Sequence, residues 1–123
     1  MISRFTDFLH SDGEKPTRDR EAEFVDRDLP RDELLRLWGA GWDCVFNALC
    51  VLNDDDLWRI VTIRTEPQTA AHAIGRQLAH YAWHVGHIAL IGKHLLGERW
   101  RYLTIAPGFS AAFNQRMGMR KLE

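Results

Sequence analysis

Three histidines between positions 80 and 87 carry the clearest chemistry in this sequence. His80 and His84 are four positions apart, and His87 follows three positions later. In an α-helix the first two lie one turn apart, about 40° around the axis, a spacing at which one metal ion can be held from a rigid helix. His80 and His87 would lie about 10.5 Å apart along the axis, so all three do not converge easily on one ion. We therefore expect a pair from this helix plus ligands from another element.

A structural role for these histidines is the alternative, since histidines at the rim of an apolar face are often hydrogen-bonded boundary residues. The segment from His80 to His84 has no glutamate at the position that a zinc-protease helix requires, so that enzyme class is excluded. The other histidines stand alone in the sequence and are expected at the surface: His10, His72 and His94.

The longest predicted helix carries the histidine pair. We expect it over about 68–96, opened by Pro67 and Thr69 and closed by Gly97. Its apolar positions recur at helical spacing and cover a broad arc. They are Ile74, Leu78, Tyr81, Val85, Ile88, Ile91 and Leu95.

A second long helix is predicted over about 30–53. A proline followed by acidic residues marks its start, and apolar side chains then recur every third or fourth position. Trp38 and Trp42 lie in this apolar stripe, so they are expected in the core. Shorter helices are predicted in residues 1–9 and from 110 to 117, the latter opened by a capping serine.

The remaining segments are predicted as extended pieces and a loop. Residues 57–64 and 100–105 are rich in β-branched and aromatic side chains and can pair as a small ribbon. Residues 12–28 alternate in charge sign, which predicts a solvated loop with short-lived ion pairs and Phe24 as its one apolar anchor. Together these elements predict an all-α fold, an incomplete four-helix bundle with two long helices.

The composition is that of one ordinary globular domain. With 123 residues, 46% hydrophobic and 27% charged, we expect a single domain over 1–123. A net charge of −1 argues against a general nucleic-acid binder. No apolar run approaches the roughly 20 residues of a membrane span and no secretory signal is visible, so we expect no membrane partner and a cytoplasmic location. Cys44 and Cys50 would face opposite sides of their helix and form no disulfide.

Motifs along nearly the whole chain resemble one branch of the DinB/YfiT-like metalloenzyme superfamily. The motifs that carry the resemblance are Ser3-Arg4-Phe5, Asp7-Phe8-Leu9, Ser11-Asp12-Gly13-Glu14-Lys15, Arg18-Asp19-Arg20, Glu23-Phe24, Trp38 with Gly41-Trp42, Ile63-Arg64, Ala73-Ile74, Arg76-Gln77-Leu78, His80 through Lys93, Trp100, Leu103 to Pro107, Gly108, Ser110 and Phe113-Asn114.

The resemblance implies a DinB-like four-helix bundle, often dimeric, that holds a divalent metal, Zn²⁺ or Ni²⁺, with three histidines. Two of them would be His80 and His84. In relatives of known activity the metal activates a low-molecular-weight thiol, so the resemblance implies a metal-dependent S-transferase or hydrolase-like enzyme with a small-molecule substrate. His87 stands where relatives usually carry glutamine; it is either a substitute third ligand or a hydrogen-bonding residue, and we favour the hydrogen bond.

The resemblance also implies that part of the family pattern lies upstream of Met1. The first helix, most of the second and the third histidine ligand would be absent from 1–123. For such a shortened form two alternatives stay open: the metal binds without the third histidine, or it is absent. A misassigned start codon is one explanation, and a true truncation that dimerises or exchanges elements is the other. The alternative function is a non-catalytic helical module for dimerisation or small-ligand binding, with structural histidines.

Overall fold

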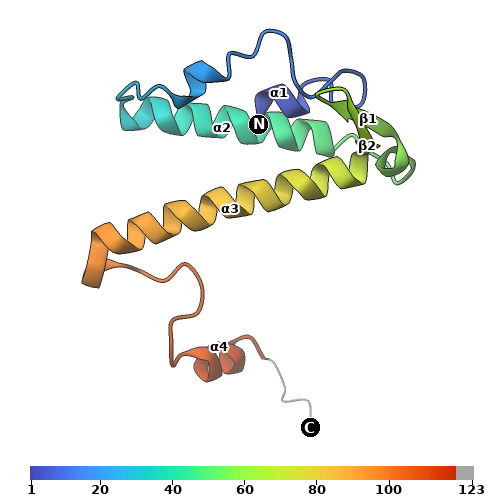
Figure 1. Cartoon of the computed structure of the whole chain (residues 1–123). Helices are drawn as coiled ribbons and strands as arrows, with labels where there is room; N and C mark the ends of the chain where they lie inside the picture. Colours follow the sequence, from blue (N-terminus) through green and yellow to red (C-terminus); the bar gives the residue numbers. More distant parts are fainter. Residues whose placement is uncertain (119–123) are drawn as a thin grey trace. The chain divides into compact units, whose positions relative to one another are not determined.

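The computed structural model describes residues 1–118 of the chain. They belong to two compact units, residues 1–80 and residues 81 onward, and each unit is described by itself. In chain order the elements of the described residues are α1 (Ile2–Phe5), a 3₁₀ helix (Glu21–Phe24), α2 (Arg31–Leu49), a second 3₁₀ helix (Asp55–Trp58), β1 (Ile60–Ile63), β2 (Glu66–Thr69), α3 (Ala70–Leu96), a third 3₁₀ helix (Gly97–Arg99) and α4 (Ser110–Arg116) (Figure 1).

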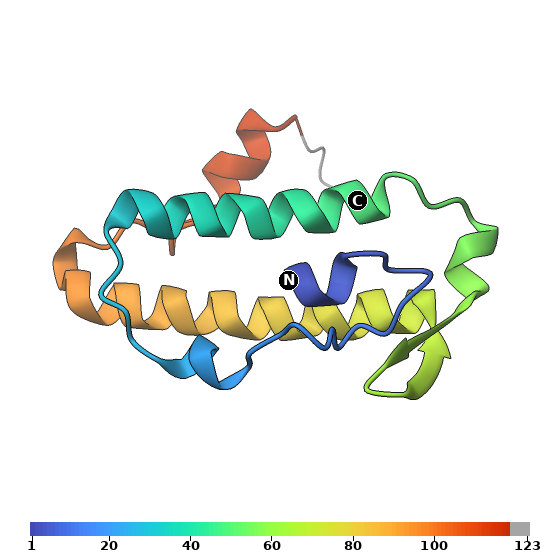
Figure 2. The ribbon, with the colours of Figure 1, turned by 90° about the horizontal axis from the view of Figure 1, so that it is seen from above.

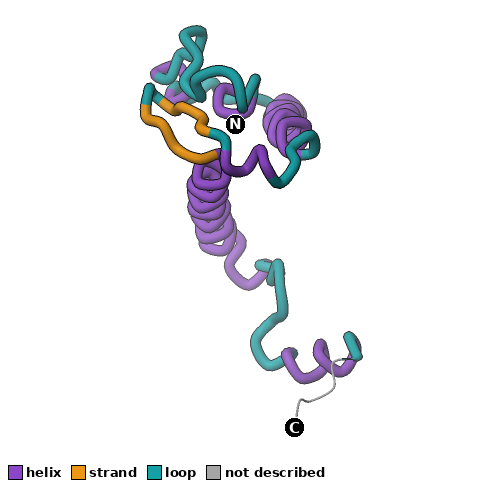
Figure 3. The backbone as a smooth tube through the Cα atoms, turned by 90° about the vertical axis from the view of Figure 1, so that its right-hand side faces the viewer, coloured by secondary structure: helices purple, strands orange, loops and turns teal. Residues whose placement is uncertain are grey.

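The prediction of an all-α fold is wrong, because β1 and β2 form an antiparallel sheet. Ile60 pairs with Thr69 at one end of this hairpin, and Ile63 pairs with Glu66 at the other. Pro67 lies within β2. Proline has no backbone N–H to donate, and it is tolerated here because β2 is an edge strand. Figure 3 shows the hairpin leading directly into α3. The fold of the described residues is therefore helical with a small sheet, and not a four-helix bundle.

The predicted ribbon between residues 57–64 and 100–105 is also wrong. The first stretch contains β1, but its partner is β2, which follows immediately in the chain. Residues 100–105 contain no strand, and the Trp100 N–H donates to the Gly97 carbonyl at 3.0 Å. Pairing across a two-residue turn closes a much shorter loop than pairing with a distant segment, and its loss of chain entropy is correspondingly smaller.

Both long helices lie inside the predicted ranges, and their ends differ for local reasons. α2 ends at Leu49, four residues before the predicted end at Asn53. There the Asn53 Oδ1 accepts the N–H groups of Asp55 and Asp56, at 2.9 and 3.1 Å, and so begins the next turn. The sequence predicts that Ser110 is the N-cap of the last helix. In the structure it is the first helical residue of α4, and the N-cap is Phe109. No helix of residues 1–118 combines the length and apolar character that crossing a membrane requires.

The hydrophobic core of the first unit is small. Its buried side chains are Phe5, Phe8, Val45, Val61, Ile63, Ala70 and Ala73. Phe5 stacks on Phe8 with ring centroids 5.2 Å apart, and α1 packs on α2. Gly41 makes this close packing possible, since a Cβ there would lie 3.0 Å from the Met1 Sδ.

An aromatic ladder runs along α2. Trp38 and Trp42 meet edge to face at 6.0 Å, and Trp42 stacks on Phe46 at 5.5 Å. Trp38 is 48% exposed and Phe46 is 59% exposed. The prediction that Trp38 lies in the core is therefore wrong.

The segment between α1 and α2 is mostly irregular (Figure 2). Phe24, the predicted apolar anchor, is 71% exposed, and the Arg20 guanidinium lies 5.6 Å from its ring centre. Arg18 and Glu23 instead form a paired contact, with nitrogen–oxygen distances of 2.6 and 2.8 Å. Polar contacts, rather than an apolar side chain, hold this segment in place.

In the second unit, Trp100 lies against the C-terminal part of α3. A Cβ on Gly92 would lie 3.3 Å from the Trp100 ring, so the glycine accommodates that ring. α3 ends at Leu96, and Gly97 takes the left-handed conformation, with φ of 52°, expected of a residue that closes a helix.

Candidate functional site

His80 and His84 lie one turn apart on α3. The helix is continuous over Ala70–Leu96, so the spacing of four residues places both imidazoles on the same side of its axis. Both residues are exposed and lie outside the hydrophobic core. Two imidazoles so placed can chelate one divalent ion and leave its other coordination positions to other donors.

Trp83 contacts the rings of two of the three histidines. Its ring centre lies 4.8 Å from that of His84, edge to face, and 4.1 Å from that of His87. The His87 Nδ1 lies 2.8 Å from the Trp83 carbonyl oxygen. A carbonyl oxygen only accepts, so Nδ1 donates and carries the proton. His87 thus makes a hydrogen bond to the backbone of its own helix.

Within the part of the chain that the structure describes, no third donor side chain joins the pair His80 and His84. Among residues 1–118, histidine, cysteine, aspartate and glutamate side chains form no group of three or more that could hold a metal ion. The described residues therefore supply a histidine pair and not a complete protein coordination shell. Cys44 and Cys50 are both free thiols, as expected.

A second polar cluster joins the N-terminal segment to the hairpin. The Asp12 Oδ1 accepts the backbone N–H of Glu14 at 2.7 Å and that of Arg64 at 2.9 Å, and Oδ2 accepts that of Thr65 at 2.8 Å. These N–H groups, Glu14 first and Thr65 next, lower the pKa of Asp12 to about 2. The carboxylate is therefore ionised throughout the neutral range.

Glu14 is the centre of three ion pairs. Its Oε2 lies 3.0 Å from the Arg4 Nη2 and 3.0 Å from the Arg64 Nε, and its Oε1 lies 3.1 Å from the Arg18 Nη1. Desolvation alone would raise the pKa of Glu14, but the hydrogen bond from Arg64 and the charges of Arg4 and Arg18 outweigh it and lower that pKa. The Arg4 side chain is only 15% exposed, so it depends on this carboxylate.

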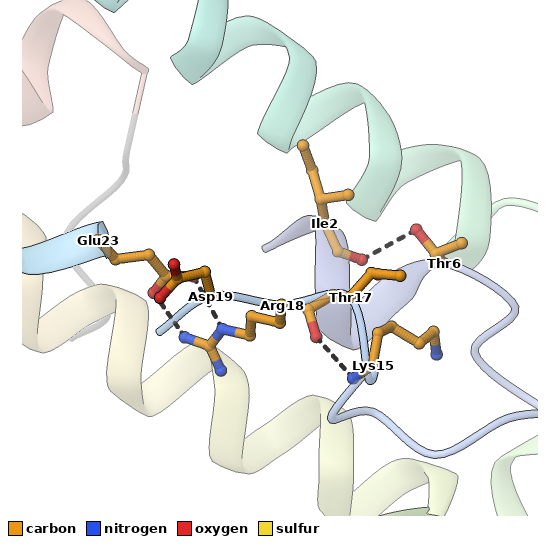
Figure 4. A pocket seen from close by; sticks show the side chains of 8 residues that line it. Ile2, Thr6, Lys15, Thr17, Arg18, Asp19 and Glu23 are labelled. Atoms are coloured by element: carbon orange, nitrogen blue, oxygen red, sulfur yellow. Dashed lines mark hydrogen bonds and ion pairs between the residues drawn. The ribbon is translucent and has the colours of Figure 1, made fainter. Parts of the chain in front are cut away.

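An open pocket of about 430 Å³ lies beside this cluster (Figure 4). It is lined by Ile2, Ser3, Thr6, Lys15, Thr17, Arg18, Asp19 and Glu23. Its two cations already donate to protein acceptors: Arg18 binds Glu23, and the Lys15 Nζ lies 2.7 Å from the Ser11 Oγ and 2.6 Å from the Asp12 carbonyl. The pocket is thus bordered by groups that hold the N-terminal segment together.

The sequence interpretation missed the cluster around Asp12 and Glu14, which it assigned to a solvated loop. The Asp12–Glu14 bond is an Asx turn, and an aspartate followed by glycine is a local signal for one. The partners in the hairpin are 50 or more residues away in the chain, and a single sequence gives no signal for them.

A model for a family described as proteins of unknown function, DUF1572, matches residues 1–109. No curated protein and no solved structure matches the chain. The family match covers α1 through α3 and includes the histidine pair, the hairpin and the Asp12 cluster. This chain therefore belongs to the DUF1572 family.

Proposed function

We propose that this protein belongs to the DinB/YfiT-like superfamily and binds a divalent metal ion, Zn²⁺ or Ni²⁺, with His80 and His84 as two of the ligands. The observation that carries the proposal is their position one turn apart on the same side of the continuous helix α3. The resemblance of the sequence motifs to that superfamily supports it, since a histidine pair of this kind binds the metal there.

The donor chemistry fits a metal of this class. Neutral imidazole is a preferred ligand of Zn²⁺ and Ni²⁺, and both rings are exposed on the helix. Catalytic zinc sites keep a coordination position open, and a pair leaves at least one for water or substrate. Among residues 1–118 no third histidine, cysteine, aspartate or glutamate side chain joins the pair. The remaining coordination positions of the metal would therefore be filled by other donors. When bound, such a metal lowers the pKa of a coordinated thiol and makes it a nucleophile, which is the chemistry of S-transfer.

The side chain of Trp83 would limit the orientation of one of the two proposed ligands, His84. His84 has the Trp83 ring at its edge, and this contact limits the directions in which its imidazole can turn. His87 donates from Nδ1 to the Trp83 carbonyl, and its ring also lies against Trp83. We assign His87 the role of holding Trp83 in place beside His84. For the substrate class we propose a small thiol.

Metal titration of the full chain, purified without a histidine tag, tests the proposal. We expect His80→Ala and His84→Ala each to weaken Zn²⁺ or Ni²⁺ affinity by more than about tenfold, because even changes to residues behind a ligand weaken binding that much. His72→Ala is the matched control. His72 is also an exposed histidine of α3, but it lies about 12 Å before His80 along the axis. Equal affinity in all four proteins would contradict the proposal.

Self-association through α2 is the second candidate function, and the exposed aromatic ladder favours it. Leu34, Trp38 and Phe46 each leave about half of their surface exposed or more. Apolar patches of this kind commonly lie at subunit interfaces. A homodimer formed through this face predicts that Phe46→Glu lowers the mass measured by light scattering, whether or not metal is present. A monomeric wild-type protein would contradict it.

A further inference from the structure

The turn between β1 and β2 has an unfavourable sequence. Its central residues, Arg64 and Thr65, have φ of 55° and 66°. Hairpin turns with positive φ at both central positions strongly prefer Asn-Gly, because side chains with a Cβ are strained there and β-branched ones most of all. Thr65 is β-branched, so contacts outside the turn must stabilise this conformation.

Asp12 supplies those contacts. Its two carboxylate oxygens accept the backbone N–H groups of both strained residues, Arg64 at 2.9 Å and Thr65 at 2.8 Å. Both are hydrogen bonds to an ionised acceptor and are stronger than those between neutral groups. In the observed left-handed conformation both N–H groups of the turn point toward Asp12.

The residues that follow Asp12 are also fastened to the hairpin. The Gly13 N–H donates to the Thr62 carbonyl at 2.8 Å, which continues the contact along β1. The Ser3 hydroxyl donates to the Gly13 carbonyl at 2.9 Å and accepts the Lys15 N–H at 3.2 Å. The segment Ser11–Lys15, which we call the strap, is thus bonded to α1 on one side and to the hairpin on the other.

We propose that Asp12 is a conformational latch: its carboxylate compensates the strained Arg64–Thr65 turn, so that the strap and the β1–β2 hairpin open and close together. Without the carboxylate the turn loses the contacts that offset its strain, and the strap loses its attachment to the turn. The two segments are therefore one cooperative unit, although they are far apart in the chain.

The hairpin that the latch closes is joined to the start of α3. The Ala70 N–H donates to the Arg59 carbonyl at 2.8 Å, which ties the helix start to the residue before β1. The Thr69 Oγ1 accepts the His72 N–H at 3.2 Å and caps the helix. Ala70 and Ala73 are buried in the first unit. Opening of the hairpin would therefore expose the first turn of the helix. The inference stands on these contacts alone and does not depend on metal binding.

Hydrogen–deuterium exchange of the full chain tests the latch. We expect Asp12→Ala to speed exchange of the hairpin amides and of the strap amides together, by about tenfold or more, as the loss of charge-assisted hydrogen bonds implies. Asp26→Ala is the matched control. Asp26 also accepts a backbone N–H two residues on, that of Asp28 at 3.0 Å, beside a positive φ. That bond is local, so we expect no change in hairpin exchange.

A second variant separates strain from attachment. Thr65→Gly removes the penalty for positive φ, so in Asp12→Ala/Thr65→Gly the hairpin should regain protection while the strap stays open. This double variant also serves if Asp12→Ala alone does not fold. Unchanged hairpin exchange in Asp12→Ala, acceleration of equal size in Asp26→Ala, or a double variant whose hairpin stays unprotected would each overturn the proposal.

Discussion

The Asp12 carboxylate accepts the Thr65 backbone N–H at 2.8 Å, across 53 positions of the chain. This contact joins the N-terminal segment to a turn whose own sequence does not favour its conformation. The hairpin in turn leads without a break into α3, which carries the histidine pair. Asp12 is thus structurally connected to the element that positions the proposed metal ligands.

The first prediction concerns acid stability. The folded pKa of Asp12 is about 2, below its ordinary value of 3.8. A depressed folded pKa means that the carboxylate stabilises the fold above pH 4, and that this contribution is lost as the pH falls from about 4 to about 2. The pKa values of Glu14 and Glu23 are also lowered, so their contributions fall in the same direction. In denaturant titrations at stepped pH, we expect Asp12→Asn to flatten this acid slope, and an unchanged slope would contradict the assignment.

The second prediction concerns Gly13, which is buried between α1 and the hairpin. A Cβ there would lie 3.0 Å from the Ile63 Cγ1 and 3.2 Å from the Arg4 Cδ. We expect Gly13→Ala to lower the free energy of unfolding by about 1–3 kcal/mol through overpacking. Gly39→Ala in α2 is the control, since nothing lies within 4 Å of its Cβ position. It should raise that free energy by about 0.5–1 kcal/mol, and a Gly13→Ala protein as stable as wild type would be evidence against this packing.

The third prediction concerns the three arginines around Glu14. Glu14→Gln leaves the mostly buried Arg4 guanidinium without its anionic partner. We expect the free energy of unfolding to fall by about 1–2 kcal/mol, less than for a fully buried pair because Glu14 is partly exposed. Glu33→Gln removes a similar pair with Arg36 that is largely exposed on α2, and it should have no measurable effect. Equal losses of unfolding free energy in the two variants would show that the burial of Arg4 is not the cause of the destabilisation.

The fourth prediction concerns His87. His87→Gln keeps a group that can donate to the Trp83 carbonyl, as the Nδ1 of His87 does at 2.8 Å. We expect metal affinity to stay within about threefold of wild type, whereas His84→Ala lowers it by more than about tenfold. A loss in His87→Gln as large as that in His84→Ala would assign His87 as a ligand and correct its proposed role.

The sequence predicts the elements that depend on local order. The apolar spacing of α2 and α3 and their flanking residues indicate both long helices, and the spacing of His80 and His84 follows from the helix that contains them. The hairpin could not be predicted in this way, because Arg64-Thr65 is not a favourable turn sequence and its stabilising partner, Asp12, is remote. The sequence therefore predicts the start of the following helix at about residue 68, where the structure has the second half of β2.

The candidate site divides along the same line. The spacing of His80 and His84 predicts that they lie on one side of a helix, because that relationship depends only on local order. The partners of Glu14 come from α1, from the hairpin turn and from the loop around Arg18, and only the folded chain brings them together. The exposure of Trp38 illustrates the same limit, since an apolar stripe shows which face of a helix is apolar but not how much of it is covered.

The proposed function is tested most directly by elemental analysis of tag-free protein after exposure to Zn²⁺ or Ni²⁺ and dialysis. We predict about one metal ion per chain for the wild type and for His72→Ala. We predict close to none for the His80→Ala/His84→Ala double variant, because it lacks both proposed imidazole ligands of the site. A wild-type protein without metal, or a double variant that retains as much metal as the wild type, would contradict the assignment of this histidine pair.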